Sequence, residues 1–305
     1  MSLAKILPFI AVTFFSFAPL HPEVRCPGNG PSKPLHEVAN ALLTVRVDIN
    51  GTGPYEFIVD TGAQVTTVDS VLASELHLGA GGTVGVSGAA TYARNPFTYL
   101  DSVAVGGQTV LHTLAVIQDI AQLKMADTHI RGILGENFLA HFDVLINNQR
   151  HTLCLDTSKA LAAAVTGGRT LLEKPYGSEP DMPFTRPLVV SAFLGAAQAN
   201  PVLLRLDSGS NAPLLYASSL PAASLNKKHS LSREVSGSVQ WFDVLPPRDI
   251  QVGRHLVRQV EFVTPRGDAG KGPHQREDGV LPTFAFESVF ISYSDGYAVL
   301  KPWAH

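Results

Sequence analysis

The sequence predicts an all-β protein built from two similar lobes. Its 305 residues are 45% hydrophobic and only 16% charged, which is enough for a large core and two domains of ordinary size. The 26 glycines and 21 prolines favour strands and turns, because both residues interrupt helices. The third observation is an internal repeat, in which each half of the chain carries the same motifs in the same order.

The charge balance indicates no surface for nucleic acid. Lysine and arginine total 23 against 26 acidic residues, a formal net charge of −3. The 11 histidines show no metal-ligand spacing such as His-Glu-x-x-His. We therefore expect no nucleic-acid partner, no metal and no other cofactor.

Residues 1–25 have the order of an export signal. Lys5 precedes the apolar run from Ile6 to Leu20, which is too short for a comfortable membrane span, and a polar segment with prolines follows. We expect an exported protein, periplasmic or secreted, in which this segment is either removed or kept as the one membrane anchor. Residues 26–40 are rich in proline, glycine and polar groups and are predicted to be a linker.

The predicted first lobe, residues 41–157, begins with a hairpin. Leu43 to Ile49 alternates apolar and polar residues, as a half-buried strand does, and Tyr55 to Val59 returns after a turn rich in Asn and Gly. The hairpin delivers Asp60 to its end. Further strands of this lobe are expected at residues 103–107, 110–117, 142–146 and 152–155.

Two apolar strands end in a polar motif that packing alone does not explain. The first leads into Asp60-Thr61-Gly62-Ala63 and the second into Asp207-Ser208-Gly209-Ser210. The interval from Asp60 to Ile133-Leu134-Gly135 equals the interval from Asp207 to Val280-Leu281-Pro282. The chain therefore uses one unit twice. We predict that residues 158–184 link the lobes and that residues 185–305 form the second.

These motifs resemble those of the pepsin/retropepsin superfamily of aspartic proteases. More narrowly, they resemble exported bacterial proteins related to retropepsins, here with two lobes in one chain. The resemblance covers residues 40–157 well and residues 186–303 more weakly. It implies acid-protease lobes of the closed β-barrel type with the active site between them. It also implies a monomer with pseudo-two-fold symmetry and a polypeptide substrate.

The resemblance implies an endopeptidase whose catalytic dyad is Asp60 and Asp207. Two carboxylates about 3 Å apart cannot both ionise, so the pair shares one proton. The ionised member activates a water molecule, and the protonated member hydrogen-bonds the peptide carbonyl. The hydroxyl residue beside each aspartate is expected to bond across the interface, and the next glycine lets backbone amides approach both carboxylates. The residues expected to support the dyad are Thr61, Gly62, Ser208 and Gly209.

A glycine-rich segment in the first half resembles the flap that closes over substrate. Within residues 79–99, Gly88 and Tyr92 are candidates for substrate contact. The equivalent segment of the second half, residues 233–244, contains Trp241 and suggests a second flap. Each aromatic residue can equally be an ordinary strand residue that packs on its own sheet.

Two residues qualify the resemblance: Ser210, which follows the second motif as in pepsin-like enzymes, and Pro282. Ser210 carries a hydroxyl that can donate to the second aspartate and favour its ionised form, so we predict an acid optimum less extreme than that of a pepsin. Pro282 stands where the pattern has glycine and lacks a backbone donor, so the supporting loop of the second lobe must differ. Two other hypotheses stay open: an inactive peptide-binding protein on the same fold, and a homodimeric protease that uses only Asp60.

Cys26 and Cys154 are the only cysteines. In an exported protein, a disulfide can tie the N-terminal arm to the end of the first lobe. The alternative is two unpaired thiols, with Cys154 a small core residue.

Overall fold

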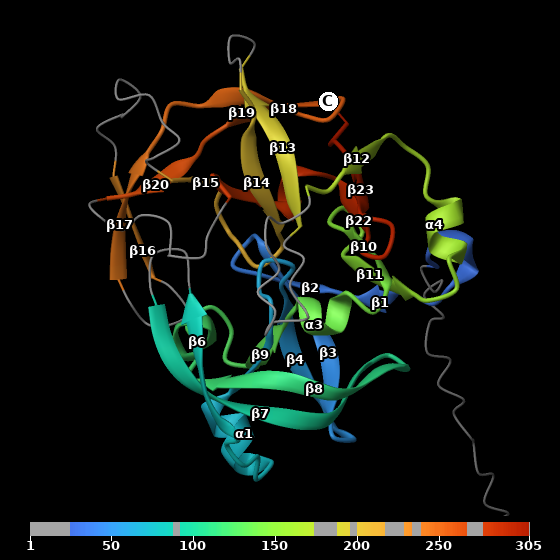
Figure 1. The fold of residues 1–305 in the computed structure, drawn as a ribbon, viewed down its shortest axis with the longest axis vertical. Helices are drawn as coiled ribbons and strands as arrows, with labels where there is room; N and C mark the ends of the chain where they lie inside the picture. The colour runs from blue at the N-terminus through green and yellow to red at the C-terminus, as the bar shows by residue number, and fades with distance from the viewer. Residues whose placement is uncertain are drawn as a thin grey trace, which may run out of the picture.

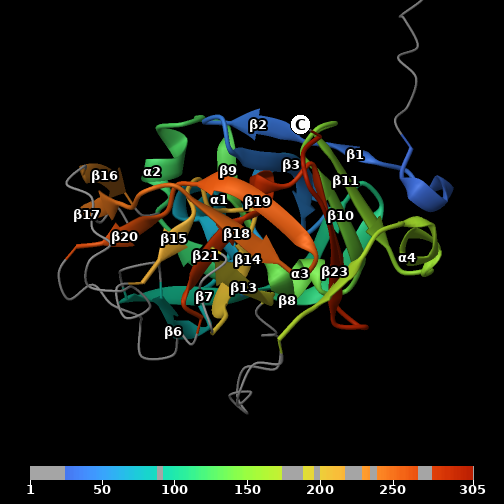
Figure 2. The same ribbon diagram turned by 90° about the horizontal axis from the view of Figure 1, so that it is seen from above.

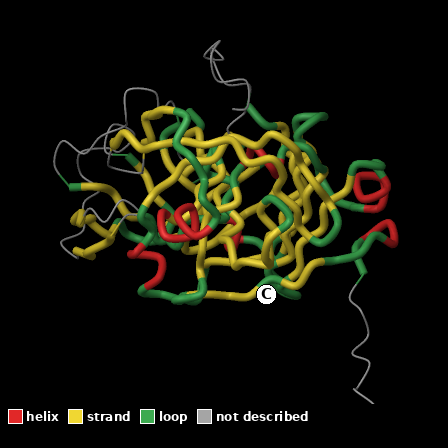
Figure 3. Tube along the Cα trace, turned by 90° about the horizontal axis from the view of Figure 1, so that it is seen from below, coloured by secondary structure: helices red, strands yellow, loops and turns green. Residues whose placement is uncertain are grey.

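The structure, a computed structural model, describes residues 25–87, 92–173, 188–195, 200–216, 229–233, 239–266 and 277–304. Strands dominate these residues, and the helices are short (Figure 3). The strands form three sheets within the described ranges, with one half of the chain below the other in Figure 1 and the third sheet beside both. The predicted all-β fold with two lobes is confirmed.

The described part of the first lobe forms an eight-stranded sheet. Its strand order is β2-β3-β4-β9-β5-β8-β7-β6. The predicted hairpin is present, because the alternating β3 pairs with β4 in antiparallel register. The bounds are β2 (His36–Val38), β3 (Leu42–Ile49), β4 (Thr52–Val59), β5 (Thr66–Asp69), β6 (Gly82–Ser87), β7 (Tyr92–Val105), β8 (Gln108–Gln118) and β9 (Ile130–Leu134).

The second lobe forms a nine-stranded sheet in its described residues. The order is β16-β17-β20-β15-β21-β14-β13-β18-β19. Its central pair, β14 and β21, is parallel, as β4 and β9 are in the first lobe. The bounds are β13 (Val189–Leu194), β14 (Val202–Asp207), β15 (Leu214–Leu215), β16 (His229–Arg233), β17 (Val239–Val244), β18 (Arg248–Val252), β19 (His255–Val260), β20 (Val263–Pro265) and β21 (Gly279–Pro282).

The third sheet is shared by the two halves (Figure 2). The hairpin that ends each half pairs with the other at its centre, where Leu145 in β10 lies opposite Phe290 in β22. The described order is β1-β11-β10-β22-β23-β12. The bounds are β1 (Lys33–Pro34), β10 (Asp143–Asn147), β11 (Thr152–Asp156), β12 (Arg169–Leu171), β22 (Ser288–Ser292) and β23 (Tyr297–Lys301).

Both segments expected to be linkers contain regular structure. In residues 26–40, β1 pairs with β11 and β2 pairs with β3. In residues 158–184, β12 pairs with β23. These strands have only two or three residues, so the sheet edges they meet, and not an alternating pattern of their own, hold them in place. The short helices are η1 (Pro27–Asn29), α1 (Ser70–Glu75), α2 (Ala121–Lys124), α3 (Glu136–Leu139), α4 (Ala160–Ala164) and η3 (Thr283–Ala285).

The largest hydrophobic cluster runs through both lobes. It includes Phe57 and Leu134 from the first and Leu206 and Leu281 from the second, all without measurable exposure. The lobes therefore share one core, which fixes their relative position. Within the described residues, none of the helices has the length and apolar character needed to span a membrane. The predicted signal segment lies almost entirely outside the described residues.

Cys26 and Cys154 form a disulfide, which confirms the first of the two alternatives. The bridge joins the segment before β1 to β11 and packs in a buried cluster with Leu161 and Phe290. It closes a loop that contains almost the whole first lobe.

We predict that replacing both cysteines, in Cys26→Ser/Cys154→Ser, lowers the free energy of unfolding by roughly 2–5 kcal/mol, because the unfolded chain loses a long cross-link. Urea unfolding of the parent with and without dithiothreitol provides the control. The reduced parent should unfold at the same urea concentration as the double variant. Equal midpoints for the oxidised parent and the variant would contradict the prediction.

Candidate active site

The two aspartates occupy equivalent places at the ends of buried strands. In the first lobe, Val59 at the end of β4 lies opposite Leu134 of the parallel β9, and the Asp60 N–H donates to the Leu134 carbonyl at 3.0 Å. In the second lobe, Asp207 ends β14 opposite Pro282 of the parallel β21. Each aspartate thus lies at the end of a parallel pair of apolar strands, next to the other lobe.

The structure brings the two predicted dyad residues together. Asp60 Oδ1 accepts hydrogen bonds from the N–H groups of Gly62 at 2.8 Å and Ala63 at 2.9 Å, and Asp207 Oδ1 accepts one from Gly209 N–H at 2.7 Å. A Cβ atom on Gly62 would lie 2.3 Å from Asp207 Oδ2, and one on Gly209 would lie 2.2 Å from Asp60 Cγ. Each carboxyl group therefore covers the glycine of the opposite motif, which places the two carboxyl groups beside each other.

Four hydrogen bonds cross the interface behind the carboxyl groups. Thr61 Oγ1 donates to the Leu206 carbonyl at 3.0 Å and accepts from Ser208 N–H at 3.0 Å. Ser208 Oγ donates to the Val59 carbonyl at 2.7 Å and accepts from Thr61 N–H at 3.1 Å. Both side chains are buried, so these bonds are shielded from competing water. The two turns are thereby held as one rigid unit.

The electrostatic environments of the two aspartates differ. Burial raises the pKa of Asp60 above its ordinary value, while hydrogen bonds from the Gly62 and Ala63 N–H groups and the charge of Arg205 limit the rise. Burial raises the pKa of Asp207 well above its ordinary value, and the charge of Asp60 raises it further. Burial thus opposes the ionisation of both carboxyl groups, and the charge of Asp60 opposes that of Asp207 further.

Glu136 is a buried acidic residue beside the first motif, which the sequence analysis did not single out. It opens α3, and its N–H donates to the Ala63 carbonyl at 2.8 Å. Burial raises the pKa of its carboxyl group well above the ordinary value, the charge of Arg205 opposes this rise, and both aspartates add to it. The available signal was an acidic residue directly after an apolar Ile-Leu-Gly run.

The expected donation from Ser210 to Asp207 is wrong. The Ser210 hydroxyl donates to the Ala212 carbonyl at 2.8 Å, because the loop after the second motif turns its backbone toward it. The high pKa of Asp207 thus comes from burial and from the Asp60 charge, and this hydroxyl does not lower it.

Pro282 changes the supporting loop of the second lobe, as expected. In the first lobe, the Gly135 N–H donates to Thr66 Oγ1 at 3.2 Å, a bond that proline cannot make. A Cβ atom on Gly135 would lie 2.7 Å from the Val65 carbonyl carbon, so the first lobe has no room for a side chain there. Pro282 takes an extended conformation, with φ −61° and ψ 142°, and ends β21 before η3.

The three predicted flap residues have different outcomes. Gly88 lies outside the described residues. Tyr92 begins β7 with 60% of its surface exposed, and its ring lies over Gly85 of β6, where a Cβ would be 2.3 Å from its hydroxyl. Trp241 on β17 is 52% exposed. Both aromatics thus lie on hairpins of the expected kind, and their contact with substrate stays a prediction.

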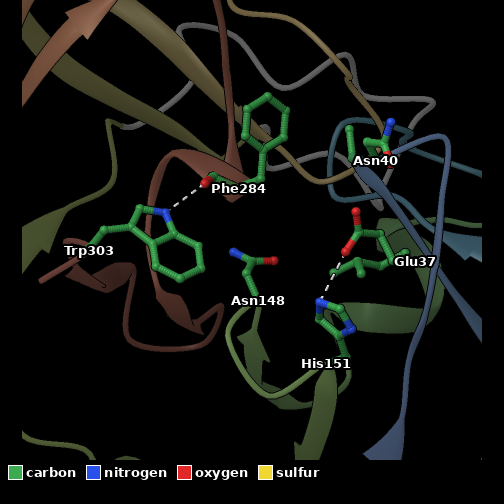
Figure 4. Close-up of a pocket in the computed structure, with 8 residues that line it drawn as sticks. Glu37, Asn40, Asn148, His151, Phe284 and Trp303 are labelled. Carbon is green, nitrogen blue, oxygen red and sulfur yellow. Dashed lines mark hydrogen bonds and ion pairs between the residues drawn. The ribbon is translucent and has the colours of Figure 1, made fainter.

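A separate pocket of about 250 Å³ lies beside the C-terminal segment, and none of the predicted site residues lines it (Figure 4). Its polar groups bond one another: His151 Nε2 lies 3.1 Å from Glu37 Oε2, and the Trp303 indole donates to the Phe284 carbonyl at 3.0 Å. In the described chain, no group of three or more potential metal ligands is present.

Comparison with known families agrees with the geometry of the first lobe. Residues 45–138, which include the first aspartate and the Ile133-Leu134-Gly135 motif, match the family model described as Aspartyl protease. This match supports the predicted resemblance of the first lobe to aspartic proteases. A retropepsin-like aspartic protease from Rickettsia conorii is 18% identical in a match that covers 41% of this chain and 87% of that one, with a TM-score of 0.30. A search of curated proteins finds no match.

We predict that Gly62→Ala and Gly209→Ala each lower the free energy of unfolding by roughly 1–3 kcal/mol, because the new methyl group overlaps the aspartate of the opposite motif. Gly79→Ala is the matched control, since no atom lies within 4 Å of its added Cβ. Thermal unfolding measures all three variants. If Gly62→Ala and Gly209→Ala unfold at the same temperature as Gly79→Ala, the close approach of the two motifs is refuted.

We predict that Glu136→Gln makes stability less dependent on pH. The pKa of Glu136 is raised in the folded state, so its contribution to stability is fully present below the ordinary value of 4.5 and is lost as pH rises through the folded pKa. Above pH 4.5, the free energy of unfolding of the variant should rise relative to that of the parent, by at most about 1.4 kcal/mol per pH unit. Urea unfolding from pH 4 to 8 measures this difference. The exposed Glu261→Gln serves as control, and parallel curves for parent and Glu136→Gln would contradict the prediction.

Proposed function

We propose that this protein is an aspartic endopeptidase in which each lobe supplies one carboxyl group of the dyad, Asp60 and Asp207. The observation that carries the proposal is the mutual approach of the two motifs, in which each aspartate lies against the glycine of the other. The match of the first lobe to the aspartyl protease family supports the general activity.

The two carboxyl groups have different tasks in the proposed reaction. Asp60, which accepts two backbone hydrogen bonds, is the ionised member and removes a proton from water as the water oxygen attacks the peptide carbonyl carbon. Asp207 holds the shared proton and donates a hydrogen bond to the carbonyl oxygen as that oxygen gains negative charge. The tetrahedral intermediate then collapses, the carbon–nitrogen bond breaks, and the leaving nitrogen takes the proton held by Asp60.

The crossing hydrogen bonds of Thr61 and Ser208 give this chemistry its geometry. They link each turn to the strand that carries the opposite aspartate, so the two carboxyl groups cannot move apart independently. A fixed, partly desolvated pair avoids reorganisation during the reaction. Gly62 and Gly209 complete the support, because their lack of a side chain permits the close approach.

The substrate in this proposal is a polypeptide. Tyr92 on β7 and Trp241 on β17 expose large aromatic surfaces on the two hairpins that correspond to flaps, and together with Gly88 they are the proposed substrate contacts. Export to the periplasm or the medium is also proposed, and it is consistent with the disulfide, because such bonds persist in oxidising compartments.

The alternatives differ in what they require of the second lobe. A homodimeric protease that uses only Asp60 leaves no role for Asp207, whose position against Gly62 favours the single-chain dyad. An inactive peptide-binding protein is favoured by Pro282 alone. Because Asp207 still accepts the Gly209 N–H bond beside this proline, we prefer the active enzyme.

The test is cleavage of a mixed peptide library by the purified protein between pH 3 and 7, beside Asp60→Asn and Asp207→Asn. We predict that each substitution lowers kcat/KM by at least about 10²-fold, because it removes a member of the acid–base pair. An equal mixture of the two variants should remain as inactive as either alone.

Other results identify the alternatives. An active Asp207→Asn protein would support the homodimer. A folded parent that cleaves no peptide at any pH would support the inactive binding protein.

A further inference from the structure

We infer that the ion pair of Arg205 and Glu277 positions the first-lobe turn of the dyad and sets the pH range over which the dyad works. This role rests on the proposed endopeptidase function.

Arg205 joins the lobes directly beneath the dyad. It lies on β14 two residues before Asp207, so both side chains leave the same side of the strand. Its Nη1 donates to the Gly62 carbonyl of the opposite lobe at 2.8 Å, and its Nη2 lies 2.7 Å from Glu277 Oε1. The side chains of Arg205 and Glu277 are 15% and 4% exposed. A largely buried guanidinium thus binds Glu277 at one end and holds the Gly62–Ala63 peptide at the other.

The first lobe builds the same strand crossing without charges. Ile58 precedes its aspartate by two residues, as Arg205 does in the second lobe, and Ile130 holds the position equivalent to Glu277. Ile58 and Ile130 belong to one buried hydrophobic cluster. Burying an ion pair costs more desolvation free energy than burying two isoleucines, and an apolar pair is often as stable or more so. Packing therefore does not account for the charges in the second lobe.

The charge of Arg205 acts on the acidic groups around the dyad. It lowers the pKa of Asp60, of Asp207 and of Glu136, and so opposes the effect of burial on each. Burial raises the pKa of Tyr293, and the charges of Glu136 and Asp60 raise it further. The titratable and charged groups that face one another here are Asp60, Asp207, Glu136, Tyr293, Arg205 and Glu277.

Glu277 determines how much of the arginine charge reaches the dyad. It binds the Nη2 side of the guanidinium, while Nη1 faces the Gly62 carbonyl. Because Glu277 carries the opposite charge, it partly cancels the field of Arg205 at the aspartates. Removal of Arg205 should therefore raise the pKa values of the two aspartates, and removal of Glu277 should lower them.

The experiment compares the pH dependence of kcat/KM in four variants of the full protein. Arg205→Met removes the cation and should move the acid limb of the profile to higher pH by roughly 1 pH unit. Glu277→Gln removes the anion that partly cancels the charge of Arg205 and should move the acid limb to lower pH. Arg205→Ile/Glu277→Ile copies the apolar pair of the first lobe and should fall between the parent and Arg205→Met. Arg205→Lys keeps the charge but loses the two-ended geometry of the guanidinium. It should therefore lower kcat/KM and leave the acid limb at the same pH as in the parent.

The order of the acid limbs decides the inference. Arg258→Met, at an exposed position of β19, is the matched control and should not shift the limb. Lower activity with coincident limbs in all variants would reduce Arg205 to a structural residue and overturn the inference. If Arg205→Met fails to fold, the order of Glu277→Gln, the parent and the double isoleucine variant still decides. A folded parent that cleaves nothing would instead refute the proposed function, and the inference with it.

Discussion

The structure depends on holding two acidic side chains against each other at a buried interface. Asp60 and Asp207 repel when both are ionised. The protein must therefore supply hydrogen-bond donors to the carboxylates, keep other side chains out of the space between them and prevent the lobes from separating. The glycine in each motif removes the bulk, and the N–H groups of the same turns supply the donors. Thr61 and Ser208 then lock the turns with four bonds that each begin in one lobe and end in the other.

The remainder of the chain keeps the lobes from separating. A hydrophobic cluster crosses the interface, and the shared sheet pairs the closing hairpins of the two halves strand to strand. The disulfide joins Cys26 to β11 in this same sheet. Against this frame, the two lobes differ mainly in polar detail: Arg205 and Glu277 replace an apolar pair, and Pro282 replaces a glycine. The near-symmetric fold thus carries an asymmetric charge distribution beside the two aspartates.

The sequence predicted those features that depend on local pattern. Alternation revealed the hairpin before Asp60, and the equal intervals in each half revealed the repeat. Features that depend on distant partners could not be predicted: the pairing of β10 with β22, the short strands at sheet edges, and the use of Arg205 as a bridge. A lone arginine in an apolar strand looks like an exposed residue until its two partners are known. The role assigned to Ser210 was wrong for the same reason, because a hydroxyl bonds to whichever acceptor the loop presents.

The central claim is that one chain contains one complete dyad. It is tested most directly by titration with a peptide whose scissile amide is replaced by a tetrahedral, hydroxyl-bearing group, which mimics the transition state. Calorimetry at acid pH gives the stoichiometry, and light scattering gives the mass of the complex. We predict one inhibitor per chain on a particle with the mass of a single 32.6 kDa chain. One inhibitor per two chains, or no binding to the folded protein, would contradict the account.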